Sequence, residues 1–261
     1  MEINFSKYQG TGNDFVIIDN RSLQFSKNDT KLVKQLCDRK FGIGADGVIL
    51  LENHPEADFS MVYYNADGRP GSMCGNGGRC IVAFAKKLGI INDNTTFEAV
   101  DGKHFARIKD GHVHLQMQDV DTITERNGHL FMDTGSPHHV EFVDQLDTYD
   151  VKSNGSRIRY SELYGEAGSN INFVETQNGS FALRTYERGV EDETLSCGTG
   201  ATAVALGLHH LGKAKENFVD LKVAGGQLQV TFEKMGDGYQ NIFLVGPATE
   251  VFNGTWQHAN S

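Results

Sequence analysis

Short segments that are apolar or that alternate between apolar and polar residues make up most of the chain, and Gly, Asn or Asp bounds most of them. This pattern is typical of β-strands. It predicts strands over Ile3–Gln9, Phe15–Asp19, Val48–Leu51, Phe59–Tyr64, His104–Lys109, His112–Gln118, Phe173–Glu175, Phe181–Glu187, Phe218–Val223, Gln227–Lys234 and Ile242–Val245.

Three other segments have the spacing of helices. Thr30–Arg39 carries its apolar residues close together with charges between them, whereas Asn76–Leu88 is more apolar and Gly200–Leu211 is apolar on nearly every side. A helix that is apolar all round is normally buried. We therefore expect Gly200–Leu211 and Asn76–Leu88 to be central helices, each wrapped by the strands of its own part of the chain.

The same short sequence motif occurs at the start of both predicted central helices. Cys74 and Cys197 are each followed by Gly-x-Gly and then by an apolar stretch with helical spacing. The two cysteines lie 123 residues apart. The same offset relates further pairs, namely Gly12 and Gly135, Tyr63 and Tyr186, Gly75 and Gly198, and Gly77 and Gly200. The repeat predicts an α+β fold of two similar domains, residues 1–118 and 119–248, followed by a last segment, 249–261.

Composition narrows the kind of protein. The 261 residues are enough for two domains. The formal net charge is −10 and no Lys/Arg-rich run occurs, so neither nucleic acid nor a membrane surface is an expected partner. The N-terminus lacks the layout of a signal peptide, and no apolar stretch approaches the roughly 20 residues that span a bilayer. We expect a cytoplasmic protein with reduced thiols.

Cys74 and Cys197 are the candidate reactive groups because each lies at the start of a predicted helix. Unpaired backbone N–H groups and the positive end of the helix dipole favour a thiolate there, so the thiol pKa should fall below its free value of about 8.5. The same N–H groups form an anion site. A carboxylate held between two such helix ends would place its α-carbon between the sulfurs, the arrangement that inverts a stereocentre without a cofactor. Cys37 and Cys80 read as packed residues.

Two other signals fail in context. Gly42–Gly47 matches the Gly-x-Gly-x-x-Gly of dinucleotide-binding folds, but a charged helical stretch precedes it and a strand follows it. The adjacent histidines at 138–139 and 209–210 do not share a helical face, and Cys74 and Cys80 lack zinc-site spacing. We expect no metal and no dinucleotide.

Several phrases taken together resemble diaminopimelate epimerase, a cofactor-independent family of lysine and cell-wall biosynthesis. They are Gly10-Thr-Gly-Asn-Asp-Phe15, Phe41-Gly-Ile-Gly-Ala-Asp-Gly47, Asn65-Ala-Asp-Gly68, Met73-Cys-Gly-Asn-Gly-Gly-Arg-Cys80, Gly135-Ser-Pro-His138, Asn170-Ile-Asn172, Tyr186-Glu-Arg-Gly189 and Ser196-Cys-Gly-Thr-Gly-Ala201. The resemblance implies two pseudo-symmetric domains, each a mixed sheet or barrel around a central helix, with the substrate in the cleft between them. It also implies a homodimer and a last strand near Glu250–Trp256 that returns to the first domain.

The resemblance further implies the site residues. Cys74 and Cys197 would be the acid/base pair. The reacting carboxylate would be held by backbone N–H groups of Gly75, Asn76, Gly198 and Thr199. The remaining substrate ligands would be Asn13, Asn65, Asn170, Glu187 and Arg188. Arg188 can fork to a carboxylate, Glu187 can accept from an ammonium, and the asparagines can do both. His138 would orient the site or serve the structure.

Two positions depart from the family pattern and keep other readings open. Ser136 stands where many members carry Asn, and Gly47 stands where some carry Gln, so contacts to the distal end of the substrate are fewer or different. The first expectation is an epimerase of LL- and meso-diaminopimelate. Ser136 and Gly47 leave room for a racemase of proline, hydroxyproline or histidine. A thiol redox or binding protein, in which Cys74 and Cys197 form a disulfide, is the reading from another class.

Overall fold

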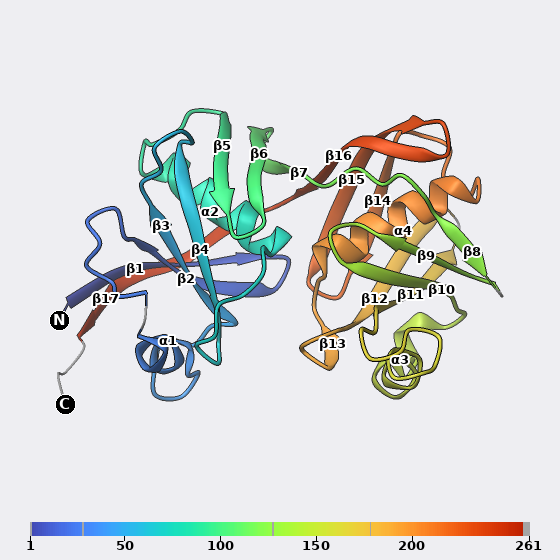
Figure 1. Ribbon diagram of the computed structural model, residues 1–261, viewed down its shortest axis with the longest axis horizontal. Helices are drawn as coiled ribbons and strands as arrows, with labels where there is room; N and C mark the ends of the chain where they lie inside the picture. Colours follow the sequence, from blue (N-terminus) through green and yellow to red (C-terminus); the bar gives the residue numbers. More distant parts are fainter. Residues whose placement is uncertain (1, 28, 127, 178, 258–261) are drawn as a thin grey trace. The chain divides into compact units, whose positions relative to one another are not determined.

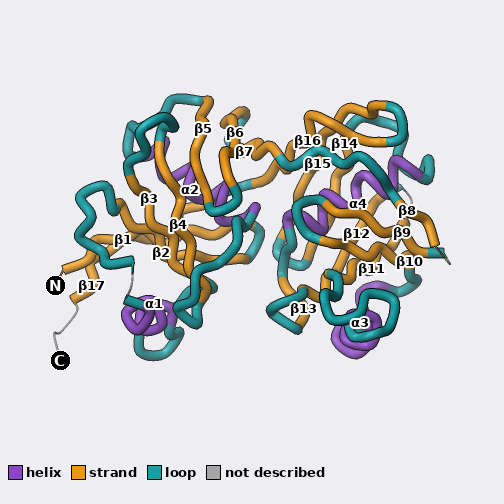
Figure 2. Tube along the Cα trace, in the orientation of Figure 1, coloured by secondary structure: helices purple, strands orange, loops and turns teal. Residues whose placement is uncertain are grey.

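The structure, a computed structural model, describes residues 2–27, 29–126, 128–177 and 179–257. The chain divides into unit 1, Met1–Leu115 with Pro247–Ser261, and unit 2, Gln116–Gly246. In each unit, strands surround one central helix, which Figure 2 shows in purple among orange strands. No helix of the described residues is both long and apolar enough to cross a membrane.

Unit 1 is a mixed sheet that curves around helix α2 (Gly75–Lys87). The strands follow the spatial order β17, β1, β2, β3, β4, β5, β6, β7, and α2 contacts β1, β2, β3 and β6. Their bounds are β1 (Glu2–Gly10), β2 (Asn13–Asp19), β3 (Gly47–Glu52), β4 (Phe59–Asn65), β5 (Asn94–Ala99), β6 (Gly102–Lys109), β7 (His112–Gln116) and β17 (Thr249–Gln257). The described residues of the expected last segment thus form a strand paired with β1, while 258–261 lie outside the described residues.

Helix α1 (Thr30–Cys37) covers the other face of β2 and β3 (Figure 1). Val16 and Val48 pack toward α1, whereas Phe15 and Ile49 lie beneath the first turn of α2. These strands are therefore buried on both faces, which is why they read as continuous apolar runs.

Unit 2 repeats this architecture around helix α4 (Gly198–His210). Its strands are β8 (Thr124–Arg126), β9 (His129–Asp133), β10 (Pro137–Phe142), β11 (Asn170–Gln177), β12 (Ser180–Glu187), β13 (Asp192–Thr194), β14 (Phe218–Val223), β15 (Gly226–Met235) and β16 (Gly238–Gly246). From β9 through β10, β11, β12, β14 and β15 to β16 the pairings run antiparallel, parallel, antiparallel, parallel, antiparallel, antiparallel. The series β1 to β7 has the same sequence of pairings.

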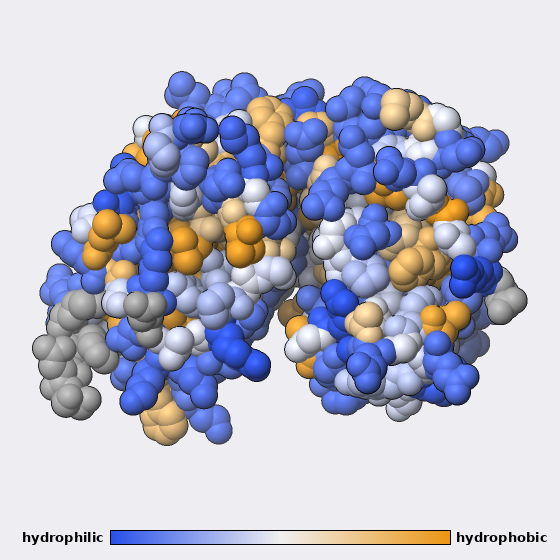
Figure 3. Space-filling model, viewed as in Figure 1, coloured by the Kyte–Doolittle hydropathy of each residue, from blue (hydrophilic) through white to orange (hydrophobic). Residues whose placement is uncertain are grey.

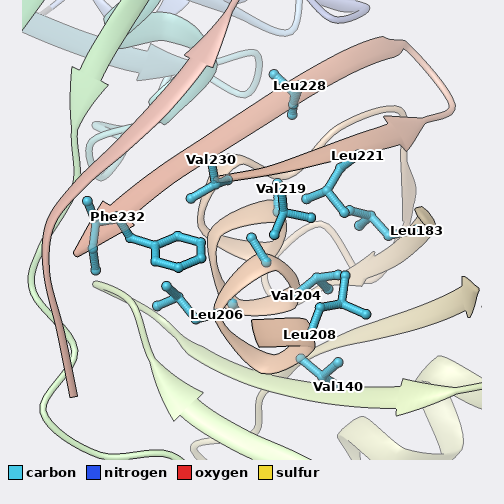
Figure 4. Close-up of a cluster of buried hydrophobic side chains, with 14 of the residues drawn as sticks. Val140, Leu183, Val204, Leu206, Leu208, Val219, Leu221, Leu228, Val230 and Phe232 are labelled. Atoms are coloured by element: carbon cyan, nitrogen blue, oxygen red, sulfur yellow. The ribbon is translucent and has the colours of Figure 1, made fainter. Parts of the chain in front are cut away.

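The core of unit 2 forms around α4, whose middle turns are buried on all sides. Figure 4 shows Leu206 of this helix on the side of Phe232, whereas Val204 and Leu208 lie on the side of Val140. Exposed large apolar side chains occur mostly singly, and the face in Figure 3 is largely hydrophilic with separate hydrophobic spots. Each unit therefore buries most of its large apolar side chains, around its central helix and beneath the outer helix α1 or α3 (Val151–Arg159).

Helix α3 (Val151–Arg159) and the turn η1 (Leu146–Thr148) pack outside β11 and β12 and are absent from the pattern-based prediction. The helix is mostly polar, with Val151 and Ile158 as its apolar contacts and a buried Gly155. Asp150 caps it by accepting from the Ser153 N–H at 3.0 Å. A Cβ on Gly155 would lie 2.4 Å from Tyr186 Cβ, so glycine is required by close packing.

Candidate functional site

Cys74 is the N-cap residue of α2. Its backbone is extended, with φ −112° and ψ 121°, and its carbonyl accepts the first helical hydrogen bond from the Gly78 N–H at 2.7 Å. The N–H groups of Gly75, Asn76 and Gly77 precede that bond and have no partner within the helix. The half-buried thiol therefore lies next to a set of backbone donors that suits an anion.

Asn13, at the start of β2, lies beside this thiol. Its Nδ2 donates to Asp46 Oδ2 at 2.6 Å, which fixes the side chain so that Oδ1 points the other way. That Oδ1 accepts from Asn76 Nδ2 at 3.3 Å and from the Cys74 thiol at 3.5 Å. Unit 1 thus brings together three of the residues singled out from sequence.

Asn65 is placed differently, at the end of β4 in a turn. Its N–H donates to the Arg69 carbonyl at 2.9 Å. A Cβ built on Gly71 would lie 3.2 Å from Asn65 Oδ1. Asn65 therefore lies beside the loop that leads to Cys74.

Tyr63 explains the glycine at position 47. A Cβ there would lie 2.5 Å from both Tyr63 Cε2 and the Tyr64 carbonyl, and one at Gly71 would lie 2.4 Å from the same ring. The ring is held between two glycines and packs edge-on against Phe15, with centroids 5.9 Å apart. Position 47 has no room for a side chain because the tyrosine occupies it.

Cys197 is the N-cap residue of α4 and has nearly the same backbone, φ −115° and ψ 114°. Its carbonyl accepts from the Ala201 N–H at 2.9 Å, and the residue is 7% exposed. A Cβ on Gly200 would lie 2.5 Å from Asn172 Oδ1, so the polar side chain of β11 touches the helix backbone directly. The N–H groups of Gly198 and Thr199 come before that first helical bond, where the helix provides no backbone acceptor.

A chain of hydrogen bonds runs from Asn172 to the Cys197 sulfur and fixes the protonation of His138. Asn172 Nδ2 donates to the His139 carbonyl at 2.8 Å and to His138 Nδ1 at 3.0 Å. Because Nδ1 accepts, the ring proton is on Nε2, which lies 2.9 Å from Thr199 Oγ1. The Thr199 hydroxyl is then able to donate toward Cys197 Sγ at 3.5 Å.

His138 is a neutral group in this chain. Burial lowers the pKa of its imidazole to about 3, and the nearby Arg188 charge acts in the same direction. The ring therefore orients Thr199 and carries no positive charge at neutral pH.

The remaining candidates of unit 2 cluster at the end of β12. Asn170 Nδ2 donates to Ser136 Oγ at 2.9 Å, and Asn170 Oδ1 accepts the backbone N–H of Arg188 at 2.9 Å. Arg188 Nη1 donates to the Ala167 carbonyl at 3.0 Å, and Glu187 Oε2 accepts from the Thr194 hydroxyl at 2.9 Å. Ser136, Asn170 and Arg188 therefore form one group, which is contiguous with His138 through Asn170.

Tyr63 and Asn172 were not assigned roles from the sequence. A signal for Asn172 was available, since strand alternation puts it on the same side of β11 as Asn170. Tyr63 gave no such signal because its contact with Gly47 depends on the pairing of β3 with β4.

The described residues hold no group of three or more His, Cys, Asp or Glu side chains that could bind a metal ion. A cavity of about 390 Å³ lies in unit 1 between β4 and β5, lined in part by Tyr63, Gly71 and Met73, but its lining does not include Cys74 or Asn13. The thiols at the two helix starts remain the candidate chemistry.

The chain matches the family model described as diaminopimelate epimerase over residues 5–123 and 130–251. It is 57% identical over 251 residues to a diaminopimelate epimerase of Flavobacterium psychrophilum, covering 95% of this chain and 98% of the relative. A protein of the same name from Chlorobaculum tepidum is 45% identical over 257 residues, covering 94% and 98%.

Solved structures share the fold at low sequence identity. A Bacillus anthracis phenazine biosynthesis protein of the PhzF family superimposes with a TM-score of 0.77 at 14% identity, covering 99% of this chain and 100% of that one. A hydroxyproline epimerase from Agrobacterium vitis gives 0.67 at 16% identity, covering 97% and 92%. These neighbours confirm the predicted fold class. With the family model and the sequence relatives, they lead to one assignment: the chain belongs to the diaminopimelate epimerase family.

Proposed function

We propose that this protein is an isomerase that interconverts LL-2,6-diaminopimelate and meso-2,6-diaminopimelate without a cofactor, in lysine and peptidoglycan precursor biosynthesis. The observation that carries the proposal is the matched placement of Cys74 and Cys197. Each is the N-cap of a 13-residue helix, and their backbone φ angles are −112° and −115°. The 57% identity to a relative named diaminopimelate epimerase supports the substrate.

The proposed reaction uses both thiols on one α-carbon. The thiolate of one cysteine takes the α-proton, so that an S–H bond forms as the C–H bond breaks, and the electron pair passes into the substrate carboxylate. The thiol of the other cysteine delivers its proton to the opposite face. Backbone N–H groups of Gly75, Asn76, Gly198 and Thr199 bind the carboxylate and stabilise the charge that develops on it. After each turnover the two sulfurs have exchanged protonation states.

In unit 2 the chain through His138 serves this step. A neutral His138 donates its Nε2 hydrogen to the Thr199 hydroxyl oxygen. The hydroxyl hydrogen can then be donated to Cys197 Sγ, which stabilises that sulfur when it is a thiolate. A charged histidine would compete for the same proton transfers, so its low pKa suits the role.

Asn13, Asn65, Asn170, Glu187 and Arg188 are the proposed ligands of the remaining amino and carboxyl groups, with Ser136 contacting Asn170. A site with several ionic partners rejects a substrate that lacks the distal groups, because those partners are then left unpaired. We also propose that the enzyme is a cytoplasmic homodimer that acts on a small molecule and binds neither nucleic acid nor membrane.

The test is deuterium uptake at the α-carbon of LL-diaminopimelate in deuterated water, followed by NMR with reduced protein. We expect incorporation together with the meso isomer. Cys74→Ala and Cys197→Ala should each lower epimerisation by at least about 10³-fold, whereas Cys37→Ala, a buried thiol in the α1 core, is the matched control and should retain activity.

Two outcomes would redirect the assignment. Near wild-type epimerisation by either Cys74→Ala or Cys197→Ala would exclude the two-thiol mechanism. Turnover of proline or hydroxyproline without any turnover of diaminopimelate would change the substrate. In that case Gly47, with the Tyr63 ring beside it, and Ser136 would be the first positions to vary.

A further inference from the structure

Arg79, one turn into α2, is a fully buried arginine. Its Nη2 donates to Thr11 Oγ1 at 3.1 Å, and its Nε donates to the Pro247 carbonyl at 3.4 Å. Its Nη1 is buried and has no hydrogen-bond partner among the described residues. A guanidinium stays protonated in proteins, so this side chain is a buried cation whose hydrogen bonding is incomplete.

The described residues provide no carboxylate to neutralise it. None of their ion pairs involves Arg79. The titratable groups whose charge acts on the guanidinium are the thiols of Cys80 and Cys74. Burial raises the pKa of Cys80 to about 12, so Cys80 remains a neutral thiol at physiological pH. Cys74 is therefore the remaining group of this pair that can become an anion.

The other charged groups around α2 are paired elsewhere or neutral. Tyr8 of β1 packs on Phe84 of the helix, and burial raises the pKa of its phenol, so it is uncharged. Glu250 of β17 pairs with Lys87 near the C-terminal end of the helix. From β2, Asp14 pairs with Lys7 and Arg39. A buried charge without a charged partner costs desolvation free energy.

The geometry of the turn between β1 and β2 also depends on Arg79. Thr11 has φ +50°, a left-handed conformation that is strained for a β-branched residue, and the guanidinium binds its hydroxyl. Thr11 precedes Asn13 by two residues, and Asn13 Oδ1 accepts from the Cys74 thiol. A Cβ on Gly10 would lie 3.2 Å from Arg79 Nη2, so glycine leaves the space that the cation occupies.

The equivalent position of α4 in unit 2 carries no cation. The repeat offset of 123 residues pairs Arg79 with Thr202, whose hydroxyl donates to the Gly198 carbonyl of its own helix at 3.0 Å. The Thr199 hydroxyl lies beside Cys197, and neutral His138 lies behind that hydroxyl. Arg188 acts on His138 but is only half-buried, so solvent screens its charge more strongly than that of Arg79.

We propose that Arg79 is a positioning residue whose buried charge favours the thiolate of Cys74, and that Cys74 rather than Cys197 is the resting base of the enzyme. The inference rests on the proposed two-thiol reaction, because a resting base is defined only if that reaction occurs. Its physical claim, a difference in acidity between two thiols, is measurable without any substrate.

The measurement is the pH dependence of iodoacetamide alkylation of the full-length reduced protein, resolved by mass spectrometry into the Cys74 and Cys197 peptides. Iodoacetamide reacts with the thiolate, so the rate of each peptide reports its own pKa. In the wild-type protein we expect Cys74 to have the lower pKa, by at least about half a unit. This comparison needs no variant and no folding control.

Arg79→Met removes the charge and keeps most of the side-chain volume. We expect it to raise the pKa of Cys74 by about one unit and to move that of Cys197 by much less. Arg79→Lys restores the charge without the fork and should recover most of the shift. The matched control is Lys86→Met, which removes a cation from the exposed far end of the same helix, where Lys86 pairs with Asp93, and should leave Cys74 unchanged.

A pKa of Cys197 equal to or below that of Cys74 in the wild-type protein would overturn the assignment of the resting base. An unchanged Cys74 pKa in folded Arg79→Met, or the same shift in Lys86→Met, would overturn the role of Arg79. If alkylation behaves as expected while the protein fails to epimerise diaminopimelate, the electrostatic inference stands and the proposed function fails.

Discussion

The first turns of α2 and α4 follow the same backbone route over different supports. Beneath Gly77 the neighbouring side-chain atoms belong to Ile49 and Phe15, whereas Gly200 lies against the amide of Asn172. The repeat offset makes Asn172 the counterpart of Ile49. The backbone N–H groups that suit an anion are the same in both units, and the side chains beneath them are free to differ.

The difference continues in the groups that act on each thiol. Unit 2 uses neutral dipoles, with His138 in the place of Phe15 and Thr202 in the place of Arg79. Unit 1 has an apolar support and, one turn into α2, the buried cation Arg79. Internal repetition thus supplies two similar helix starts, while on our proposal the acidity of each sulfur is set by side chains particular to its own unit.

The largest effect that separates the two supports should come from adding one methyl group to each helix. A Cβ at Gly200 would lie 2.5 Å from Asn172 Oδ1, whose amide is held by other hydrogen bonds, so Gly200→Ala should cost about 3 kcal/mol of unfolding free energy. Gly77→Ala would meet the flexible ends of Ile49 and Met61 at 3.1–3.2 Å and should be within about 1 kcal/mol of wild type. Urea unfolding of both variants measures this, and equal costs would contradict the comparison.

The next effect is a pH dependence of stability to which His138 of unit 2 contributes. The folded-state pKa of His138 is lowered to about 3, so its protonation favours the unfolded chain once the pH falls below about 6.5. Stability should therefore drop by about 2 kcal/mol between neutral pH and pH 5, above the range in which Asp14, with a pKa lowered to about 2, begins to contribute.

His138→Asn should make the stability profile shallower over that interval, because the ring with the largest pKa shift is removed, while His114, His129 and His209, whose pKa values burial also lowers, still titrate. Thermal unfolding across the pH series gives the slope for each protein. The position of Phe15 in unit 1 provides the contrast, since its side chain cannot titrate. An unchanged slope in His138→Asn would mean that other groups cause the acid sensitivity.

A smaller effect on catalysis should follow from removing the Thr199 hydroxyl. Thr199→Val keeps the backbone N–H and the shape but removes the donor to Cys197 Sγ, so kcat should fall about tenfold with a smaller change in KM. Thr199→Ser restores the hydroxyl and should restore most of the rate. The measurement is steady-state kinetics in both reaction directions. Equal losses of kcat in Thr199→Val and Thr199→Ser would show that the effect is structural and does not come from the hydroxyl.

The smallest effect is expected at Thr202. Its hydroxyl donates to the Gly198 carbonyl within α4. Such a side-chain bond to the preceding turn adds little to helix stability, so Thr202→Val should change the free energy of unfolding by less than about 1 kcal/mol. The pKa of Cys197 from alkylation should not move. A large shift there would show that the hydroxyl takes part in the electrostatics of unit 2 after all.

Much of the fold could be predicted because long alternating strands and two apolar helices produce strong periodic patterns. The missed elements have weak ones. In β10, buried His138 and His139 occupy core positions that the pattern assigns to apolar residues, and α3 is largely polar with a central glycine. In both cases tertiary packing overrides local preference.

The candidate site divides in the same way. The two cysteines and their glycines could be found from sequence because a helix start imposes its chemistry locally. The neutral state of His138 could not, since it follows from complete burial and from the Asn172 amide. Nor could the isolation of Arg79, because the missing carboxylate is a property of all the elements around the helix.

The pairing of β17 with β1 has a consequence for how the protein is made. Unit 2 is continuous in the chain and is complete on the ribosome before β17 is synthesised, whereas β1 must wait for its antiparallel neighbour with an open edge. The Pro247 carbonyl that binds Arg79 belongs to the same late segment. If Arg79 acts on Cys74 as proposed, its hydrogen bonds are complete only after the C-terminal strand has docked. In a nascent chain that lacks this strand, the Cys74 thiol would therefore not yet have its final acidity.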